Sequence, residues 1–218
     1  MSLEDYEAAG ILPEALLNFL GRMGWSMPDE REKFTYAEMV EAFTFDRMHL
    51  GGPIFDLDKL DWLNGLYLRE LDPAAIVARL REWLLSDAYL GTVVPLVRER
   101  MTRLSEFIPK TAWLFGEPTP LAKEAYIPKG KTQAETFEIV TAIAELVDRH
   151  VKWQVADLEA AFRALCETTG WKPKDLFSIV RLIATASAAA PPLFDSLHAL
   201  GKARTQSRVR QALALLKP

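Results

Sequence analysis

Closely spaced carboxylates are the first groups in this 218-residue sequence that could perform acid–base chemistry. Asp56, Asp58 and Asp61 are such a set. They stand where an apolar-periodic segment begins, and acidic side chains at that place cap a helix and interact favourably with its dipole. We therefore interpret them as helix-start residues and predict no catalytic residue among them.

Sulfur and imidazole groups form no reactive or metal-binding pattern. The single cysteine, Cys166, cannot form an internal disulfide, and its neighbours Leu158, Phe162 and Leu165 predict a small buried thiol. The three histidines lie far apart and lack zinc-ligand spacing. Glycine-rich phosphate loops and nucleophile elbows are also missing. We expect no metal and no cofactor.

Composition narrows the classes of protein further. Half of the residues are apolar and 26% are charged, which is ordinary for a globular chain. No run of ~18 apolar residues predicts a membrane span, and the acidic start does not resemble a signal peptide. A cytoplasmic protein without a membrane partner is expected.

Charge is unevenly distributed along the chain. Residues 1–66 carry 5 basic and 13 acidic side chains, residues 67–121 carry 7 and 7, and residues 122–218 carry 14 and 10. The corresponding net charges are −8, 0 and +4. Such a gradient can direct a polyanion to the basic end, although a solvated basic helix explains it equally well.

Helical periodicity runs through nearly the whole sequence. Start signals precede apolar residues spaced at three and four positions: a proline at a first turn, capping boxes, and Asx caps. These starts are Pro13, Thr35 with Glu38, Asp56, Asp72-Pro73, and Thr132 with Glu135. Further helices are expected over residues 90–107, around Leu158 to Leu165 with a stop at Gly170, within the apolar stretch 176–190, and as a final pair from Leu193. The fold class is therefore all-α.

Glycine and proline clusters mark the expected domain boundaries. Residues 116–120, GEPTP, form the strongest breaker, and PKGK at residues 128–131 forms a second irregular stretch. Reasoning from these patterns alone ends at a helical protein with a basic C-terminal region that is a binding module.

Three stretches resemble bacterial glutamyl-tRNA synthetases over essentially the whole chain. They read GILPEALLNFL at residues 10–20 followed by GWS at 24–26, GGPIFDLDKLDWLNG at 51–65, and PPLF at 191–194 with LGK at 200–202. Their order and spacing match the family, which makes the resemblance more specific than one short motif.

The resemblance implies three domains and a tRNA partner. Residues 1–66 would contact the tRNA stem, and residues 67–121 and 122–218 would be helical-bundle domains forming an α-helix cage around the anticodon. The implied function is binding of glutamate tRNA as the recognition half of a glutamate–tRNA ligase. DNA is not an expected partner, a monomer is expected, and residues 1–66 would join the catalytic domain in an intact enzyme.

The resemblance also implies anticodon-binding residues. Arg100 matches the position whose arginine inspects the third anticodon base, where its donor fork suits the acceptors of a cytosine. Arg98 would lie beside it. Arg181, Ala190 and Leu193 match positions near the anticodon in the last domain. Three basic residues of the C-terminal region would contact phosphates and so position the RNA; these are Lys202, Arg204 and Arg208.

Two departures from the family limit the expected function. Both ATP-binding signatures of the class are missing, so ATP and magnesium are expected only in a full-length enzyme, and this chain alone should be inactive. In SIVRLIATA, at residues 178–186, many relatives have proline where Val180 or Ile179 stands and glycine where Ala186 stands. Engineered fragment and natural stand-alone paralogue both fit the sequence. The alternative function is therefore a helical interaction module that has lost tRNA specificity.

Overall fold

The computed structural model describes residues 3–49, 51–52 and 55–218, so Met1, Ser2, Leu50 and the Pro53-Ile54 pair of the second resembling stretch lie outside the described residues. The described backbone is all-helical, as predicted, and its β pairing is one isolated antiparallel bridge between Trp25 and Met48. The chain forms two compact units: unit 1 ends at Leu85 and unit 2 begins at Ser86.

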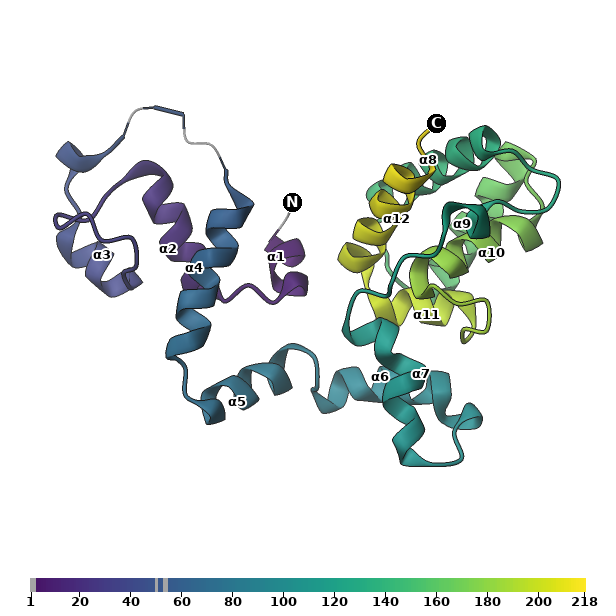
Figure 1. Cartoon of the computed structure of the whole chain (residues 1–218), viewed down its shortest axis with the longest axis horizontal. Coiled ribbons are helices and arrows are strands. Elements are labelled where there is room, and N and C mark those ends of the chain that lie inside the picture. Colours follow the sequence, from purple (N-terminus) through teal and green to yellow (C-terminus); the bar gives the residue numbers. More distant parts are fainter. Residues whose placement is uncertain (1–2, 50, 53–54) are drawn as a thin grey trace. The chain divides into compact units, whose positions relative to one another are not determined.

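Unit 1 consists of five α-helices and one short 3-10 helix (Figure 1). They are α1 Leu3–Ala9, α2 Pro13–Gly24, α3 Tyr36–Ala42, η1 Phe45–Arg47, α4 Leu57–Glu70 and α5 Pro73–Trp83. Helix α2 packs on α4 through a small core of Phe19, Leu60 and Leu63, and a separate cluster of Trp25, Met27 and Phe34 lies under α3. Two small cores, rather than one, hold this unit.

The helix starts predicted in unit 1 are confirmed. Pro13 opens α2, and Thr35 forms a complete capping box with Glu38 at α3. Asp56 accepts a hydrogen bond from the Lys59 N–H, which confirms its interpretation as a cap. Each cap pairs a backbone N–H that the first helical turn leaves without an intrahelical acceptor.

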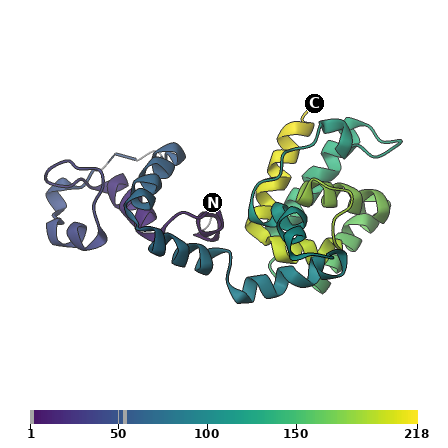
Figure 2. The ribbon, with the colours of Figure 1, turned by 60° about the horizontal axis from the view of Figure 1, so that its bottom comes forward.

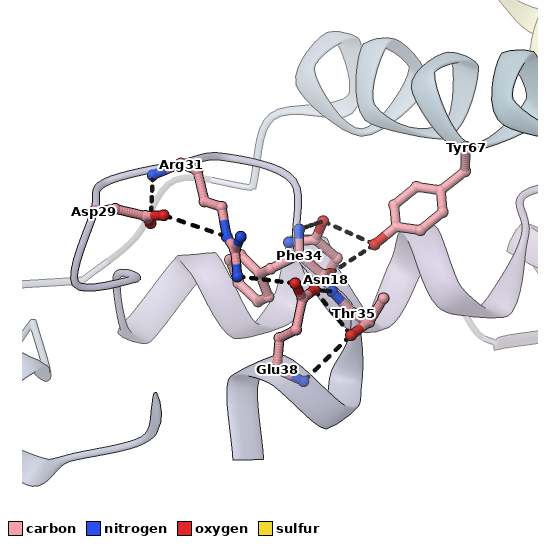
Figure 3. Close-up of polar contacts among 7 residues, drawn as sticks. All are labelled: Asn18, Asp29, Arg31, Phe34, Thr35, Glu38 and Tyr67. Carbon is pink, nitrogen blue, oxygen red and sulfur yellow. Dashed lines mark hydrogen bonds and ion pairs between the residues drawn. The ribbon is translucent and has the colours of Figure 1, made fainter. Parts of the chain in front are cut away.

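A polar network joins the two small cores of unit 1 (Figure 3). The Asn18 Oδ1 atom accepts from the Phe34 N–H at 3.1 Å and from the Tyr67 hydroxyl at 3.0 Å. The same hydroxyl lies 2.7 Å from the Phe34 carbonyl oxygen. Burial, together with nearby carboxylates, raises the pKa of Tyr67 to about 12. These bonds satisfy polar groups that apolar packing alone would leave unpaired.

Unit 2 surrounds one continuous core. Its helices are α6 Asp87–Val97, η2 Arg98–Arg100, η3 Leu104–Glu106, α7 Phe107–Phe115, η4 Lys123–Tyr126, α8 Gln133–Arg149, α9 Val155–Thr169, α10 Pro173–Thr185, α11 Leu193–Leu200 and α12 Lys202–Leu216. Figures 1 and 2 show α12, in yellow, along one side of the unit, where it packs against α8. The core includes Phe162 and Cys166, and burial raises the pKa of that thiol, as expected for an unreactive cysteine.

The single helix predicted over residues 90–107 is wrong. Helix α6 ends at Val97, η2 follows, and Met101 is extended before η3 and α7 begin. Pro95 lies inside α6, where it removes a backbone donor and weakens the last turn. The interruption matters because Arg98 and Arg100 stand on a tight turn instead of on the side of a long helix.

The apolar stretch over residues 176–190 is also not one helix. Helix α10 ends at Thr185, and Ala186 adopts a left-handed conformation with φ +49° while its N–H bonds the Leu182 carbonyl at 2.8 Å. A left-handed residue ends a helix, and glycine usually fills that place because a Cβ atom is strained there. The remaining residues therefore form a loop before α11.

The predicted domain boundaries do not coincide with the limits of the two units. The boundary at 66/67 falls inside α4, and the boundary at 121/122 falls within unit 2. The breaker over residues 116–120 is a connection inside unit 2, not a separation between units. The compact units separate between Leu85 and Ser86. The three-domain division itself stays a prediction.

Candidate RNA-binding site

A pocket of about 650 Å³ lies at the C-terminal ends of α7 and α10 in unit 2. That volume falls in the roughly 300–1,000 Å³ range of small-molecule pockets. We call it the site pocket; its lining residues are Val97, Arg100, Pro109, Lys110, Ala112, Trp113, Gly116–Thr119, Thr185–Ser187 and Ala189–Pro191. Four separate segments of the sequence meet here, because the break after α6 and the early end of α10 both leave loops at this place.

Arg100 is the predicted site residue that the structure places most clearly. Its side chain is exposed at the site pocket, and Nη1 donates to the Ala189 carbonyl oxygen at 3.1 Å. Among the described residues no other hydrogen bond or ion pair involves this guanidinium. This backbone contact uses one of the five N–H donors of the guanidinium, and the others remain available to a ligand.

Arg98 does not join Arg100. Its guanidinium donates to Glu99 Oε1 through Nη2 at 2.8 Å and Nε at 3.0 Å, and both partners are more than 70% exposed. An exposed pair of this kind contributes little to stability. Arg98 is not one of the residues that line the site pocket.

Arg208 is a buried structural residue, so its predicted phosphate contact is not supported by its position. Its side chain is 2% exposed. Nη2 donates to the carbonyl oxygens of Trp113 at 2.7 Å and Gly116 at 3.0 Å, Nη1 donates to Ala184, and Nε donates to Glu117 at 3.3 Å. The guanidinium thus ties the C-terminal end of α7 to that of α10.

The side chains of Lys202 and Arg204 also donate hydrogen bonds to carbonyl oxygens near the ends of helices. Arg204 donates to the Leu114 carbonyl of α7 at 2.6 Å, and Lys202 donates to the Asp148 carbonyl of α8 at 3.0 Å. Cations at these places pair the carbonyls that a helix C-terminus leaves without an intrahelical donor. The basic charge of α12 therefore serves packing at all three predicted positions, and their phosphate contacts stay predictions.

The other predicted residues divide between the site pocket and the core. Ala190 lines the site pocket. Leu193 is 5% exposed and belongs to the core, so its side chain does not face the site pocket. Arg181 is partly buried on α10, and its Nε atom is buried without a hydrogen-bond partner. Their roles toward RNA stay predictions.

Sequence reasoning missed Lys110 and Glu117, which both line the site pocket. Lys110 lies 3.5 Å from Glu106 one turn away, and Glu117 contacts Arg208 across 91 positions of sequence. Glu117 stands in the GEPTP breaker, which was interpreted only as a boundary. A charged residue inside a glycine–proline loop is a signal that could have drawn attention to it.

No helix among the described residues is long and apolar enough to span a membrane. The described residues also contain no group of three or more His, Cys, Asp or Glu side chains placed to hold a metal ion. Of the described residues that line the site pocket, three have charged side chains: Arg100, Lys110 and Glu117.

Comparison with known proteins assigns the family. Residues 75–213 match the family described as "Anticodon binding domain", and residues 1–62 match "tRNA synthetases class I (E and Q), catalytic domain". The chain belongs to the anticodon-binding domain family, since that match covers more than half of it. The resemblance predicted from the three sequence stretches is thereby confirmed.

Individual relatives agree with this assignment. The chain is 37% identical over 215 residues to the glutamate–tRNA ligases of Stutzerimonas stutzeri and Pseudomonas putida, covering 99% of this chain and 44% of each relative. The crystal structure of a glutamate tRNA ligase from Elizabethkingia meningosepticum in complex with its amino acid superposes with a TM-score of 0.54 at 25% identity, covering 97% of this chain and 43% of that one. The chain thus spans less than half the length of these relatives and corresponds to the C-terminal portion of glutamate–tRNA ligases.

Proposed function

We propose that this chain binds glutamate tRNA as the recognition part of a glutamate–tRNA ligase. Unit 2 would hold the anticodon loop at the site pocket, and unit 1 would contact the inner stem. In an intact enzyme, the catalytic domain would join glutamate to that tRNA using ATP and magnesium. The chain alone should not perform this reaction.

The observation that supports the proposal is the position of Arg100. Proteins read RNA sequence mainly from unstacked loop bases, through hydrogen bonds to base edges and through arginine planes. The Arg100 side chain lines the site pocket, which is large enough to admit a base, and its Nη1 donates to the Ala189 carbonyl oxygen. A rigid fork of donors suits the N3 and O2 acceptors of cytosine.

A binding titration tests this proposal. The ligands are the anticodon stem-loop of glutamate tRNA, the same hairpin with its third anticodon base changed, and an unrelated hairpin, each at two salt concentrations. Arg100→Gln should reduce the preference for the cognate loop by about tenfold, because one good base contact contributes roughly 1–3 kcal/mol of discrimination. Arg149→Gln, which removes an exposed arginine paired only with Glu145, should leave that preference unchanged.

Weak, salt-sensitive and equal binding to all three hairpins would contradict the proposal. Such behaviour is typical of a basic surface that contacts phosphates without reading bases. A helical interaction module without tRNA specificity would then be the better account of this chain.

A further inference from the structure

Glu117 places a carboxylate in the pocket that we assign to RNA. Its side chain is about half exposed, and it lines the site pocket together with Arg100. A carboxylate repels the phosphates of any nucleic acid that approaches it. Glu117 is therefore unfavourable for binding phosphates alone.

Arg208 holds this carboxylate in place. The buried guanidinium of Arg208 bonds three backbone carbonyls and the Oε2 atom of Glu117. Burying a positive charge is costly unless an anion or strong acceptors surround it, so Glu117 is tied to the interior of unit 2. No described residue bonds to the other oxygen, Oε1.

The charged side chains that line the site pocket are thus of two opposite kinds. Arg100 and Lys110 offer only donors, and Glu117 offers only acceptors. A phosphate satisfies the first group and is repelled by the second. A base edge that carries an amine beside acceptors satisfies both groups.

We propose that Glu117 determines specificity by accepting a hydrogen bond from the 4-amino group of a cytosine whose N3 and O2 atoms meet Arg100. Uracil is disfavoured at both groups, because it presents a carbonyl oxygen to Glu117 where cytosine presents the amine, and an N3–H donor to Arg100 where cytosine presents an acceptor. Adenine carries an amine beside one ring acceptor and leaves part of the arginine fork unpaired. This inference rests on the proposed function, since it assumes that an anticodon base enters the site pocket.

Three hairpins test the inference with this chain. They carry cytosine, uracil or 2-pyrimidinone at the third anticodon position; 2-pyrimidinone keeps the N3 and O2 acceptors and lacks the amine. The unaltered chain should bind the cytosine hairpin about tenfold more tightly than either of the others. Glu117→Gln should reduce the cytosine-to-uracil ratio by about threefold, because a glutamine amide can donate to the uracil oxygen. Part of the preference for cytosine should remain, because the uracil N3–H still opposes the donors of Arg100.

Glu124→Gln is the matched control. It removes the same charge from an exposed position of unit 2 outside the site pocket, and it should leave the ratio unchanged. A thermal unfolding curve shows whether Glu117→Gln keeps its fold. If that variant does not fold, the 2-pyrimidinone hairpin and the unaltered chain still decide the question.

Equal binding of cytosine and 2-pyrimidinone by the unaltered chain would overturn the inference. An unchanged ratio in a folded Glu117→Gln variant, or the same change in Glu124→Gln, would also overturn it. In these cases cognate hairpins still bind and the proposed function survives. Failure of the unaltered chain to bind any hairpin would overturn the inference and the proposed function together.

Discussion

The two units of this chain bury their apolar residues very differently. Among the described residues of unit 2, one core connects seven α-helices, from Val93 in α6 to Leu216 in α12. In the described part of unit 1, the buried residues that cluster do so in two separate groups of three. Fifteen of the twenty exposed large hydrophobic side chains found among the described residues lie in unit 1, so its apolar surface is poorly covered.

The contrast teaches that the two units depend on different sources of stability. Apolar burial is the dominant favourable term in folding, and unit 2 has the larger share of it. Unit 1 relies more on polar contacts, such as the Tyr67 network and the ion pairs of Glu32 with Arg22 and Lys59. Eleven of those fifteen exposed side chains lie within residues 1–62, the part that matches the catalytic domain family.

The largest expected effect comes from removing a core side chain in each unit. Phe162→Ala in unit 2 should cost about 3–5 kcal/mol and Leu63→Ala in unit 1 about 2–5 kcal/mol, because each residue is fully buried. Calorimetry should show two unfolding transitions, and the one at lower temperature should belong to unit 1. Each substitution should lower the midpoint temperature of its own unit only. Hydrogen exchange should be faster in α2 and α4 than in α8 and α9. A single unfolding transition shared by both units would contradict the expected difference in their stability.

The next effect concerns the buried arginine of unit 2. Arg208→Met should destabilise unit 2 by roughly 3 kcal/mol, because it leaves the carbonyls of Ala184, Trp113 and Gly116 without their donor. Arg210→Met on the same helix removes a side chain that is 58% exposed and should stay within about 0.5 kcal/mol. Chemical denaturation measures both. Equal losses would show that Arg208 is not a structural tie.

A smaller effect comes from the capping boxes, one of which lies in each unit. Thr132→Ala at α8 and Thr35→Ala at α3 should each cost about 1 kcal/mol of stability in their own unit. The two helices differ in length, 17 residues against 7, so the same substitution should melt more of α3 than of α8. Amide exchange in the first turns measures that difference.

The capping boxes also predict a pH dependence. Lys131 and then the backbone and hydroxyl of Thr132 lower the pKa of Glu135 from 4.5 to about 2. A carboxyl with a lowered folded-state pKa stabilises the fold above its unfolded value, and that contribution is lost as pH falls from 4.5 through 2. An NMR titration should find the low midpoint, and Thr132→Ala should raise it. An unchanged midpoint would contradict the capping role.

The smallest expected effect is a gain at Ala186. Ala186→Gly should raise the stability of unit 2 by about 0.5–1 kcal/mol, because glycine adopts φ +49° without Cβ strain. Thermal unfolding measures this gain. As a control, Ala184→Gly in the last turn of α10 should lower stability, since glycine is unfavourable inside a helix. A loss at both positions would mean that the left-handed cap is not strained.

Local sequence signals predicted most of the helices but not where two of them end. The starts at Asp56 and Thr132 succeeded because a cap depends on residues three positions apart, and the start at Pro13 succeeded because proline itself favours the first turn of a helix. The breaks after Val97 and Thr185 were missed because neighbouring apolar residues continue the periodic pattern. Residues at both breaks line the site pocket, together with the end of α7 and the loop that follows it.

Within the candidate site, the sequence by itself determined the residue types and the family resemblance that singled out Arg100. Only the tertiary structure decided which charges remain available to a ligand. Arg208 and Glu117 stand 91 positions apart, so no local pattern could reveal that one is buried by bonding the other. Burial and long-range hydrogen bonds depend on how the helices pack. For this reason only the tertiary structure shows that Arg208 is a buried structural residue and that Glu117 lines the site pocket.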